Sequence, residues 1–77
     1  MAVIALAQRI RAWRMARGVA IPELAERIGV TAPAIHQWES GTTEPTVANV
    51  VRAIDALGLS PQKFWGSMPK RGRRGAA

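Results

Sequence analysis

The stretch "ELAERIGVTAPAIHQWESG" (residues 23–41) predicts two short helices joined by a tight turn. Gly29 is placed to make that turn, because glycine adopts a left-handed backbone conformation without a steric penalty. Ala25 is a small residue at the point where the two helices would cross closely. The residues expected to hold this pair against the rest of the protein are all apolar: Leu24, Ile28, Val30, Ile35 and Trp38.

Both predicted helices have recognisable ends. The first is expected from about Ile21 to Ile28, with Pro22 tolerated in its first turn. In the second, Thr31 is a preferred N-cap residue, Pro33 again lies in a first turn, and Gly41 ends the helix. Such a pair is a candidate helix-turn-helix motif, although helical hairpins that do not bind DNA match the same pattern.

Two longer helices are expected on either side of this pair. The segment from about Val3 to Arg17 repeats apolar residues at helical spacing and ends at Gly18. Residues 42–46 predict a loop in which Thr46 caps a fourth helix. The apolar stripe of that helix, which would face the core, comprises Val47, Val50, Val51, Ile54 and Leu57.

A final short helix begins at Ser60 and Pro61. Phe64 supplies the residue with which this helix would join the core. Trp65 and Met68 are therefore candidates for an exposed apolar patch used in dimerisation. The alternative is that Trp65 folds back over the core.

The sequence predicts a single all-α domain followed by a tail. No alternating strand pattern appears, so we expect a compact bundle of five helices. From Gly66 onward the sequence is rich in glycine, proline and basic residues, which predicts disorder. We assign residues 1–66 to the domain and residues 67–77 to a basic C-terminal tail.

The net charge of +6 is concentrated at the two ends of the chain. Residues 1–18 contribute +4, residues 19–69 contribute −2, and residues 70–77 contribute +4. A basic chain concentrates around polyanions, of which nucleic acid is the commonest and an anionic membrane surface is the competitor. The basic residues of the tail, which either contact DNA or only keep the chain soluble, are Lys70, Arg71, Arg73 and Arg74.

Several classes of protein are disfavoured. The sequence has no cysteine, which excludes disulfides and suits a reducing cytoplasm. His36 is the only histidine and has no clustered ligands, so we expect no metal, no cofactor and no enzyme activity. The arginine-rich N-terminal segment superficially suits a transit peptide, but it supplies part of the predicted core. No stretch approaches the ~20 apolar residues of a membrane span, so a membrane partner is not expected.

The sequence from residue 10 to residue 65 resembles the Cro/phage-repressor (XRE-type) helix-turn-helix domain. The similarity is carried by "ELAERIGV" (residues 23–30), "IHQWESG" (residues 35–41) and "ALGLSP" (residues 56–61). It implies a five-helix DNA-binding repressor, antitoxin or phage switch protein that acts as a dimer on a palindromic operator. It also implies that the helix from Thr31 to Ser40 is the recognition helix, which enters the major groove of double-stranded DNA.

Two departures from the family pattern bear on how DNA would be read. Where the family has a polar cap and then a glutamine at the start of the second helix, this chain has Ala20 and Ile21. Where the family often has polar side chains at the start of the recognition helix, it has Ala32 and Pro33. The polar-poor helix therefore leaves a second function open, a protein-interaction module such as an antitoxin-like partner.

Gln37 is the best candidate for a bidentate contact to adenine, since its amide offers a donor and an acceptor together. Ala32, Pro33 and Ala34 could contact the thymine methyl group. The candidate DNA-binding residues of this helix and the following loop are Thr31, Ala32, Pro33, His36, Gln37, Ser40, Thr42 and Thr43. Specificity would then depend largely on methyl contacts and DNA shape.

Arginines of the first helix have alternative roles. Arg14 follows Trp13 in the apolar stripe, where an unpaired guanidinium would be costly to bury. In similar domains an arginine here pairs with a glutamate that corresponds to Glu39; the alternative is that Arg14 reaches a phosphate. Of the other arginines in this segment, each either contacts phosphate or is simply solvated: Arg9, Arg11 and Arg17. Arg17, beside the turn into the second helix, is included among the DNA-binding candidates.

Overall fold

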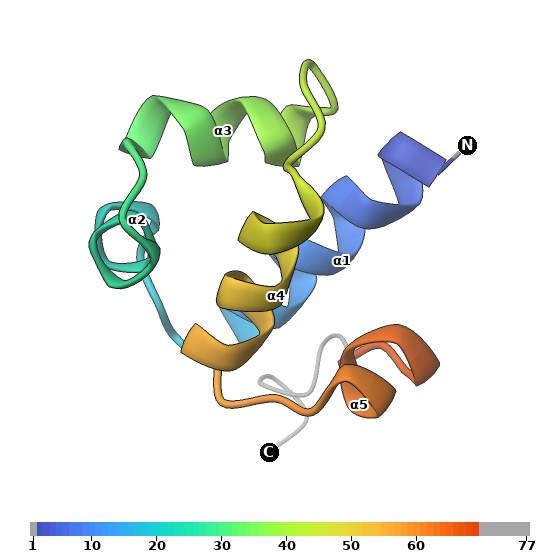
Figure 1. The fold of residues 1–77 in the computed structure, drawn as a ribbon. Helices are drawn as coiled ribbons and strands as arrows, with labels where there is room; N and C mark the ends of the chain where they lie inside the picture. Colours follow the sequence, from blue (N-terminus) through green and yellow to red (C-terminus); the bar gives the residue numbers. More distant parts are fainter. Residues whose placement is uncertain (1, 70–77) are drawn as a thin grey trace.

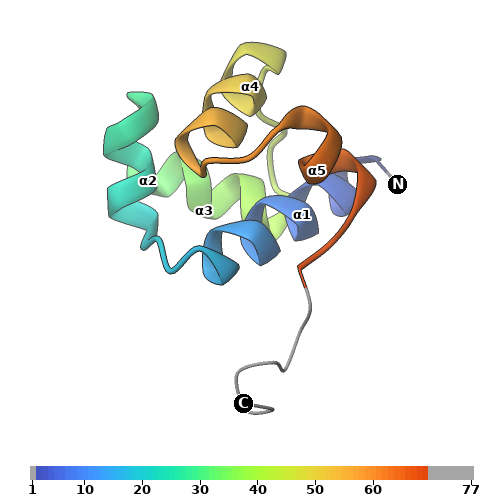
Figure 2. The ribbon, with the colours of Figure 1, turned by 90° about the horizontal axis from the view of Figure 1, so that it is seen from below.

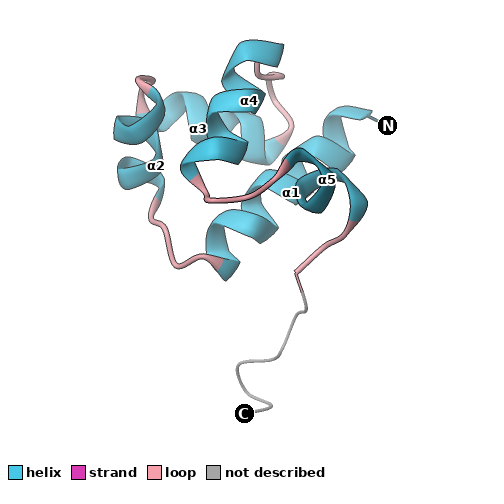
Figure 3. Cartoon of the chain, turned by 60° about the horizontal axis from the view of Figure 1, so that its bottom comes forward, coloured by secondary structure: helices cyan, strands magenta, loops and turns pink. Residues whose placement is uncertain are grey.

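A computed structural model describes the backbone of residues 2–69 and the side chains of residues 6–69. Within that part of the chain there are five helices and no strands (Figures 1 and 3). The helices are α1 (Ala2–Ala16), α2 (Ile21–Ile28), α3 (Ala32–Ser40), α4 (Val47–Ala56) and α5 (Pro61–Gly66). The prediction of an all-α, five-helix fold is confirmed. None of these helices is long and apolar enough to span a membrane.

Three helices begin at the hydroxyl residues that the sequence marked as starts. The side-chain oxygens of Thr31, Thr46 and Ser60 each accept a hydrogen bond from the backbone N–H three residues later, at 3.2, 3.1 and 3.1 Å. Each bond satisfies one of the N–H groups that a helix start leaves unpaired. The N-cap residue of α2 is instead Ala20, whose side chain makes no capping hydrogen bond. The start of α2 therefore lacks the capping bond that a polar residue, usual in the family at this position, would supply.

The turn between α2 and α3 depends on a glycine. Gly29 has φ of 77°, and its N–H donates to the carbonyl of Ala25 at 2.9 Å. The N–H of Val30 donates to the same carbonyl at 3.0 Å, so the chain leaves α2 abruptly. A residue with a side chain would be strained in this left-handed conformation. Because α2 ends abruptly, α3 can cross it directly after the turn, as a helix-turn-helix requires.

The core lies where α1, α2 and α3 meet, and α4 and α5 close it (Figures 1 and 2). α3 packs against both α1 and α2, while α4 packs against α2 and α5 contacts α1 and α4. The largest side chains that are completely buried are Ile10, Leu24, Ile35 and Phe64. Trp13 and Trp38 are buried as well. Each of the five helices therefore contributes to one core.

The predicted buried stripe of α4 is wrong at two positions. Val47 is 81% exposed and Val51 is 58% exposed. The face that is buried runs instead through Val50, Ala53, Ile54 and Leu57, the i, i+3, i+4, i+7 pattern. Val51 lies to the side of this face. Val47 is in phase with it but is the first residue of α4, where the helix has not yet packed onto the core.

The end of α5 resolves the alternatives for Trp65 and corrects the expectation for Arg9. Trp65 is 50% exposed and Met68 is 46% exposed, so Trp65 does not fold back over the core. Arg9 is only partly exposed, and its guanidinium is engaged within the protein. Its guanidinium donates to the carbonyls of Phe64 (2.9 Å) and Ser67 (2.8 Å) and lies over the Trp65 ring. Arg9 thereby binds the C-terminal end of α5 to α1.

Substituting the two neighbouring aromatic residues of α5 separates a core role from a surface role. Phe64→Ala should lower the free energy of unfolding by about 3–5 kcal/mol, because it removes a completely buried ring. Trp65→Ala should cost less, about 1–2 kcal/mol, because its ring is half exposed. Urea unfolding followed by circular dichroism at 222 nm measures both. Equal losses of stability would contradict these roles of the two rings.

Candidate nucleic-acid interface

α3 carries a continuous exposed stripe on the side away from the core. Pro33, His36, Gln37 and Ser40 follow the i, i+3, i+4, i+7 spacing of one helix face, and all four are exposed. The opposite face buries Ile35 and Trp38, which are 0% and 6% exposed. In Figure 1, α3 lies along the top edge of the molecule, and no other described helix covers its outer side. The stripe is therefore open to a large ligand.

Gln37 and His36 are the polar side chains of this stripe whose hydrogen-bonding groups remain available to a ligand. Among the described residues, neither side chain takes part in a hydrogen bond. Gln37 lies at the middle of the stripe, and its backbone carbonyl accepts a bond from the N–H of Thr42 at 2.9 Å. The chain after the helix is thus folded back onto α3 while the Gln37 amide is left free. An amide so placed has both its donor and its acceptor available.

The hydroxyl groups at the two ends of α3 are already partly engaged. The Oγ atom of Ser40 donates to the Gln37 carbonyl at 3.1 Å and lies 2.8 Å from Oγ1 of Thr42. These two side chains therefore stabilise the end of the helix, and they are less free for a ligand than the sequence suggested. Thr31 accepts the capping bond but keeps its O–H as a donor. Thr43 is exposed in the loop that follows.

The small residues at the start of α3 divide between the two faces. Ala32 and Ala34 are partly buried and pack against the core. Pro33 is exposed. Of the three residues expected to contact a thymine methyl group, Pro33 is thus the one that projects from the helix. The prediction treated the three alike because composition does not say which face of a first turn packs inward.

An ion pair between α1 and α3 fixes the orientation of the stripe. Arg14 donates from Nε to Oε2 of Glu39 at 2.7 Å and from Nη2 to Oε1 at 3.0 Å. Its third nitrogen, Nη1, donates to the carbonyl of Val19 at 2.9 Å. The side chains are only 12% and 6% exposed. All three guanidinium nitrogens are therefore engaged inside the protein, which rules out the alternative that Arg14 reaches a phosphate.

A second arginine supports the helix pair, and sequence reasoning missed it. Arg27 of α2 donates to the carbonyl of Ala56, at the end of α4, at 2.9 Å. It also pairs with Glu23 at 2.5 Å. The i, i+4 spacing of Glu23 and Arg27 was visible in the sequence. The contact with Ala56 was not, because it depends on how α4 packs.

The remaining basic candidates lie apart from the stripe. Arg17 is exposed in the turn between α1 and α2, and in Figure 1 the segment that joins these helices runs below α2, at the opposite end of that helix from α3. Arg11 is exposed on α1. The tail candidates lie outside the described residues: Lys70, Arg71, Arg73 and Arg74. The structure thus groups the polar residues of α3 and its loop but does not bring Arg17 next to them.

We expect the Arg14–Glu39 pair to contribute more to the free energy of unfolding than the same ion pair would on the protein surface. Glu39→Gln should lower the free energy of unfolding by about 3 kcal/mol, because the largely buried guanidinium loses its counter-charge. The double variant Arg14→Met, Glu39→Gln should lose at least about 1 kcal/mol less than the two single variants together.

Glu26→Gln is the matched control, since Glu26 is exposed on α2, and it should change stability by less than about 0.5 kcal/mol. Urea unfolding of the four variants measures these differences. Additive losses from Arg14 and Glu39 would show that the pair does not hold α3 in place.

The comparisons with known proteins agree with this geometry. A helix-turn-helix family model (HTH_3) matches residues 10–64. The chain is 36% identical to the P22 c2 repressor, whose crystal structure contains a synthetic operator. That match covers 77% of this chain and 89% of the chain in that crystal structure, with a TM-score of 0.68.

Two further solved structures share the fold. The clp gene regulator ClgR from C. glutamicum is 29% identical over 90% of this chain and 94% of its own, with a TM-score of 0.78. The restriction-modification controller protein C.AhdI from Aeromonas hydrophila is 23% identical over 83% of this chain and 97% of its own, with a TM-score of 0.76. Among curated protein sequences there is no significant match. The matched region includes all of α2, α3 and α4, and the chain belongs to the helix-turn-helix (HTH_3) family of DNA-binding regulators.

Proposed function

We propose that this protein is a transcriptional repressor that binds a palindromic operator as a homodimer and reads its sequence with α3. The observation that carries the proposal is the exposed stripe of α3, which presents an unengaged Gln37 amide on a helix fixed by the Arg14–Glu39 pair. A helix of this kind fits the major groove, which displays a distinct pattern of donors and acceptors for each base pair.

Gln37 would specify adenine through a bidentate hydrogen bond, and Pro33 would contact a thymine methyl group. The O–H of Thr31 would donate to a phosphate beside the start of the helix. His36 and Thr43 extend the same surface. Because few side chains carry hydrogen-bonding groups here, sequence-dependent DNA shape would supply much of the remaining specificity.

The charge of the chain supports binding to DNA. The net charge is +6, and Arg11 and Arg17 are exposed basic side chains that add to the attraction of the chain for a polyanion. The basic tail at residues 70–77 would follow the backbone of the same duplex or enter a minor groove. These contacts add affinity and fast association but carry no sequence information.

The relatives support the regulatory role. The P22 c2 protein is a repressor crystallised with operator DNA, and ClgR is a gene regulator. A dimer with two-fold symmetry would place two α3 helices in successive major grooves, with half-sites about one helical turn apart. Occupancy of such an operator would exclude RNA polymerase. We further propose that the protein acts in the cytoplasm, at the nucleoid, and that binding without catalysis accounts for its function.

A second function is favoured by a different observation. Four of the exposed large hydrophobic residues, Val47, Val51, Trp65 and Met68, belong to α4, α5 and the residue pair that follows α5. An antitoxin-like protein would use such a surface to bind another protein. In that case substitutions on α3 would leave its binding activity unchanged.

Gln37→Ala separates the two functions. With an operator selected from a random DNA pool, wild-type protein should bind at least about 1000-fold tighter than to unrelated DNA at physiological salt. Gln37→Ala should weaken operator binding by roughly 10- to 100-fold, because it removes a bidentate hydrogen bond to a base, and leave binding to unrelated DNA unchanged.

Fluorescence anisotropy with labelled duplexes of equal length measures both affinities. Gln62→Ala is the matched control, because Gln62 is an exposed glutamine on α5, away from α3. An equal effect of the two substitutions on operator binding, or no effect of either, would contradict the assigned role of Gln37.

Removing residues 70–77 tests the contribution of charge alone. The truncated chain should bind the operator and unrelated DNA more weakly by the same factor, since phosphate contacts do not distinguish sequences. The slope of log affinity against log salt should fall by roughly 0.9 for each phosphate that the tail no longer neutralises. A salt series in the same assay measures the slope. An effect confined to the operator would mean that the tail reads bases.

A further inference from the structure

His36 is the only histidine of the chain, and it lies on the outer face of α3. Its side chain is exposed and takes part in no hydrogen bond or ion pair among the described residues. Pro33 and Ser40, three residues before it and four residues after it, are its neighbours on the helix surface. A ligand that covers the outer face of α3 therefore lies close to the imidazole ring.

The neighbouring carboxylate of α3 is committed to another helix. Glu39 lies three residues after His36, a spacing at which opposite charges can pair on a helix surface. Both Glu39 oxygens instead accept from Arg14, Oε2 from Nε at 2.7 Å and Oε1 from Nη2 at 3.0 Å. The Glu39 side chain is only 6% exposed. The Arg14–Glu39 pair therefore leaves the imidazole without a carboxylate partner on its own helix.

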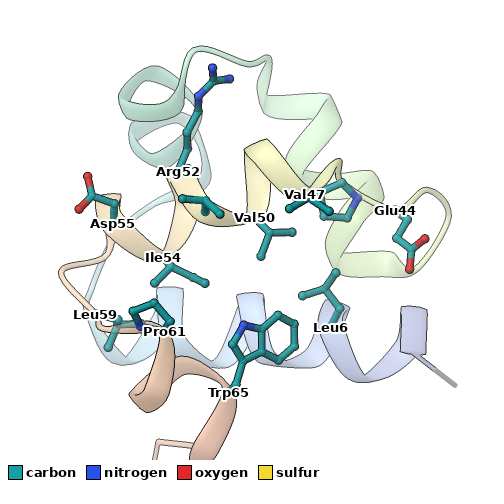
Figure 4. Close-up of a pocket in the computed structure, with 12 residues that line it drawn as sticks. Leu6, Glu44, Val47, Val50, Arg52, Ile54, Asp55, Leu59, Pro61 and Trp65 are labelled. Carbon is teal, nitrogen blue, oxygen red and sulfur yellow. The ribbon is translucent and has the colours of Figure 1, made fainter.

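The charged side chains of the surrounding elements do not pair with the imidazole either. α3 packs against α1 and α2. Of the charged side chains that these two helices and the turn between them carry in the described part of the chain, none forms an ion pair with His36: Arg9, Arg11, Arg14, Arg17, Glu23, Glu26 and Arg27. Glu44 and Asp55 line an apolar groove between α4 and α5, and no residue of α3 lines that groove (Figure 4). A positive charge on His36 would therefore be available to an external anion or acceptor.

We propose that protonation of His36 is coupled to DNA binding by α3, so that the affinity for DNA increases as the pH falls. Histidine side chains gain or lose a proton close to neutral pH. The protonated ring carries a positive charge and donates from both nitrogens, whereas the neutral ring has one donor. DNA offers matching acceptors along the major groove, which are the phosphate oxygens and the N7 and O6 atoms of guanine. The coupling rests on the proposed function, because α3 must lie against the duplex, and it adds regulation by pH to that function.

Proton binding and DNA binding strengthen each other in such a coupling. A proton that increases the affinity for DNA must itself be held more tightly in the complex than in the free protein. The affinity should therefore rise as the pH falls through the range in which histidine titrates, and it should be level well above that range. Carboxylates ordinarily titrate near pH 4, so the pH range of the experiment stays above them.

Anisotropy with the selected operator at about pH 6 and about pH 8, at constant ionic strength, measures the coupling. Wild-type protein should bind on the order of tenfold more tightly at the lower pH, because it gains a charged hydrogen bond. His36→Gln cannot gain the charge, so its affinity should be the same at both pH values. His36→Lys stays charged throughout, so its affinity should also be the same at both. Circular dichroism should confirm that both variants fold.

Gln62→His is the matched control. It adds a second histidine at an exposed position of α5, away from α3, and it should leave the wild-type dependence on pH unchanged. A larger dependence in this variant would show that any exposed histidine produces the effect, and it would overturn the specific role of His36.

Unrelated DNA of equal length identifies the acceptor. A phosphate partner predicts that the affinities for both duplexes rise by the same factor at the lower pH. It also predicts that the slope of log affinity against log salt becomes steeper by roughly 0.9. A guanine partner predicts a rise confined to the operator.

The titration of the His36 ring signals, followed by nuclear magnetic resonance, reports the proton directly. These signals are unambiguous because the chain has one histidine. A titration midpoint that moves to higher pH on addition of DNA supports the coupling. An unchanged midpoint, or a dependence on pH that His36→Gln retains, would overturn it while leaving a sequence-selective repressor intact. A proton taken up at His36 on DNA that is bound without sequence preference would support the coupling and contradict the proposed function.

Discussion

The ion pair between Arg14 and Glu39 is the interaction on which the rest of the site depends. It joins the end of α1 to the end of α3 through two hydrogen bonds, and a third bond from Arg14 holds the turn at Val19. Buried charges carry a large desolvation cost, which this pair offsets with a bond from each of the three guanidinium nitrogens. Together with Ile35 and Trp38 on the inner face of α3, it determines which side of that helix meets solvent.

This arrangement assigns different tasks to different helices of a small domain. The inner face of α3 belongs to the core, and its outer face carries the side chains proposed to read DNA. α4 buries one side against α2 and leaves Val47 and Val51 on the other. α5 closes the core with Phe64 while Trp65 faces outward, braced by Arg9. The outer face of α3 and the exposed apolar side chains of α4 and α5 therefore lie on different helices.

The sequence predicted local features well and tertiary ones less well. Helix starts at Thr31, Thr46 and Ser60 and the glycine turn at Gly29 follow from short-range chemistry, and the structure contains all of them. The Arg14–Glu39 contact was expected from the family resemblance. Other features depended on packing between distant segments, which no local pattern encodes: the exposed valines of α4, the inward-facing Ala32, and the bonds from Arg9 and Arg27 to helix ends.

The central claim, that the outer face of α3 binds DNA, is tested most directly by nuclear magnetic resonance. The amide signals of ¹⁵N-labelled protein would be followed while a selected operator duplex is added. We expect the largest changes on residues 31–43, around Gln37, with smaller changes at the arginines that contact phosphate. Changes centred on α4 and α5, with α3 unaffected, would contradict the claim and would show that the DNA-binding surface is a different face of the protein.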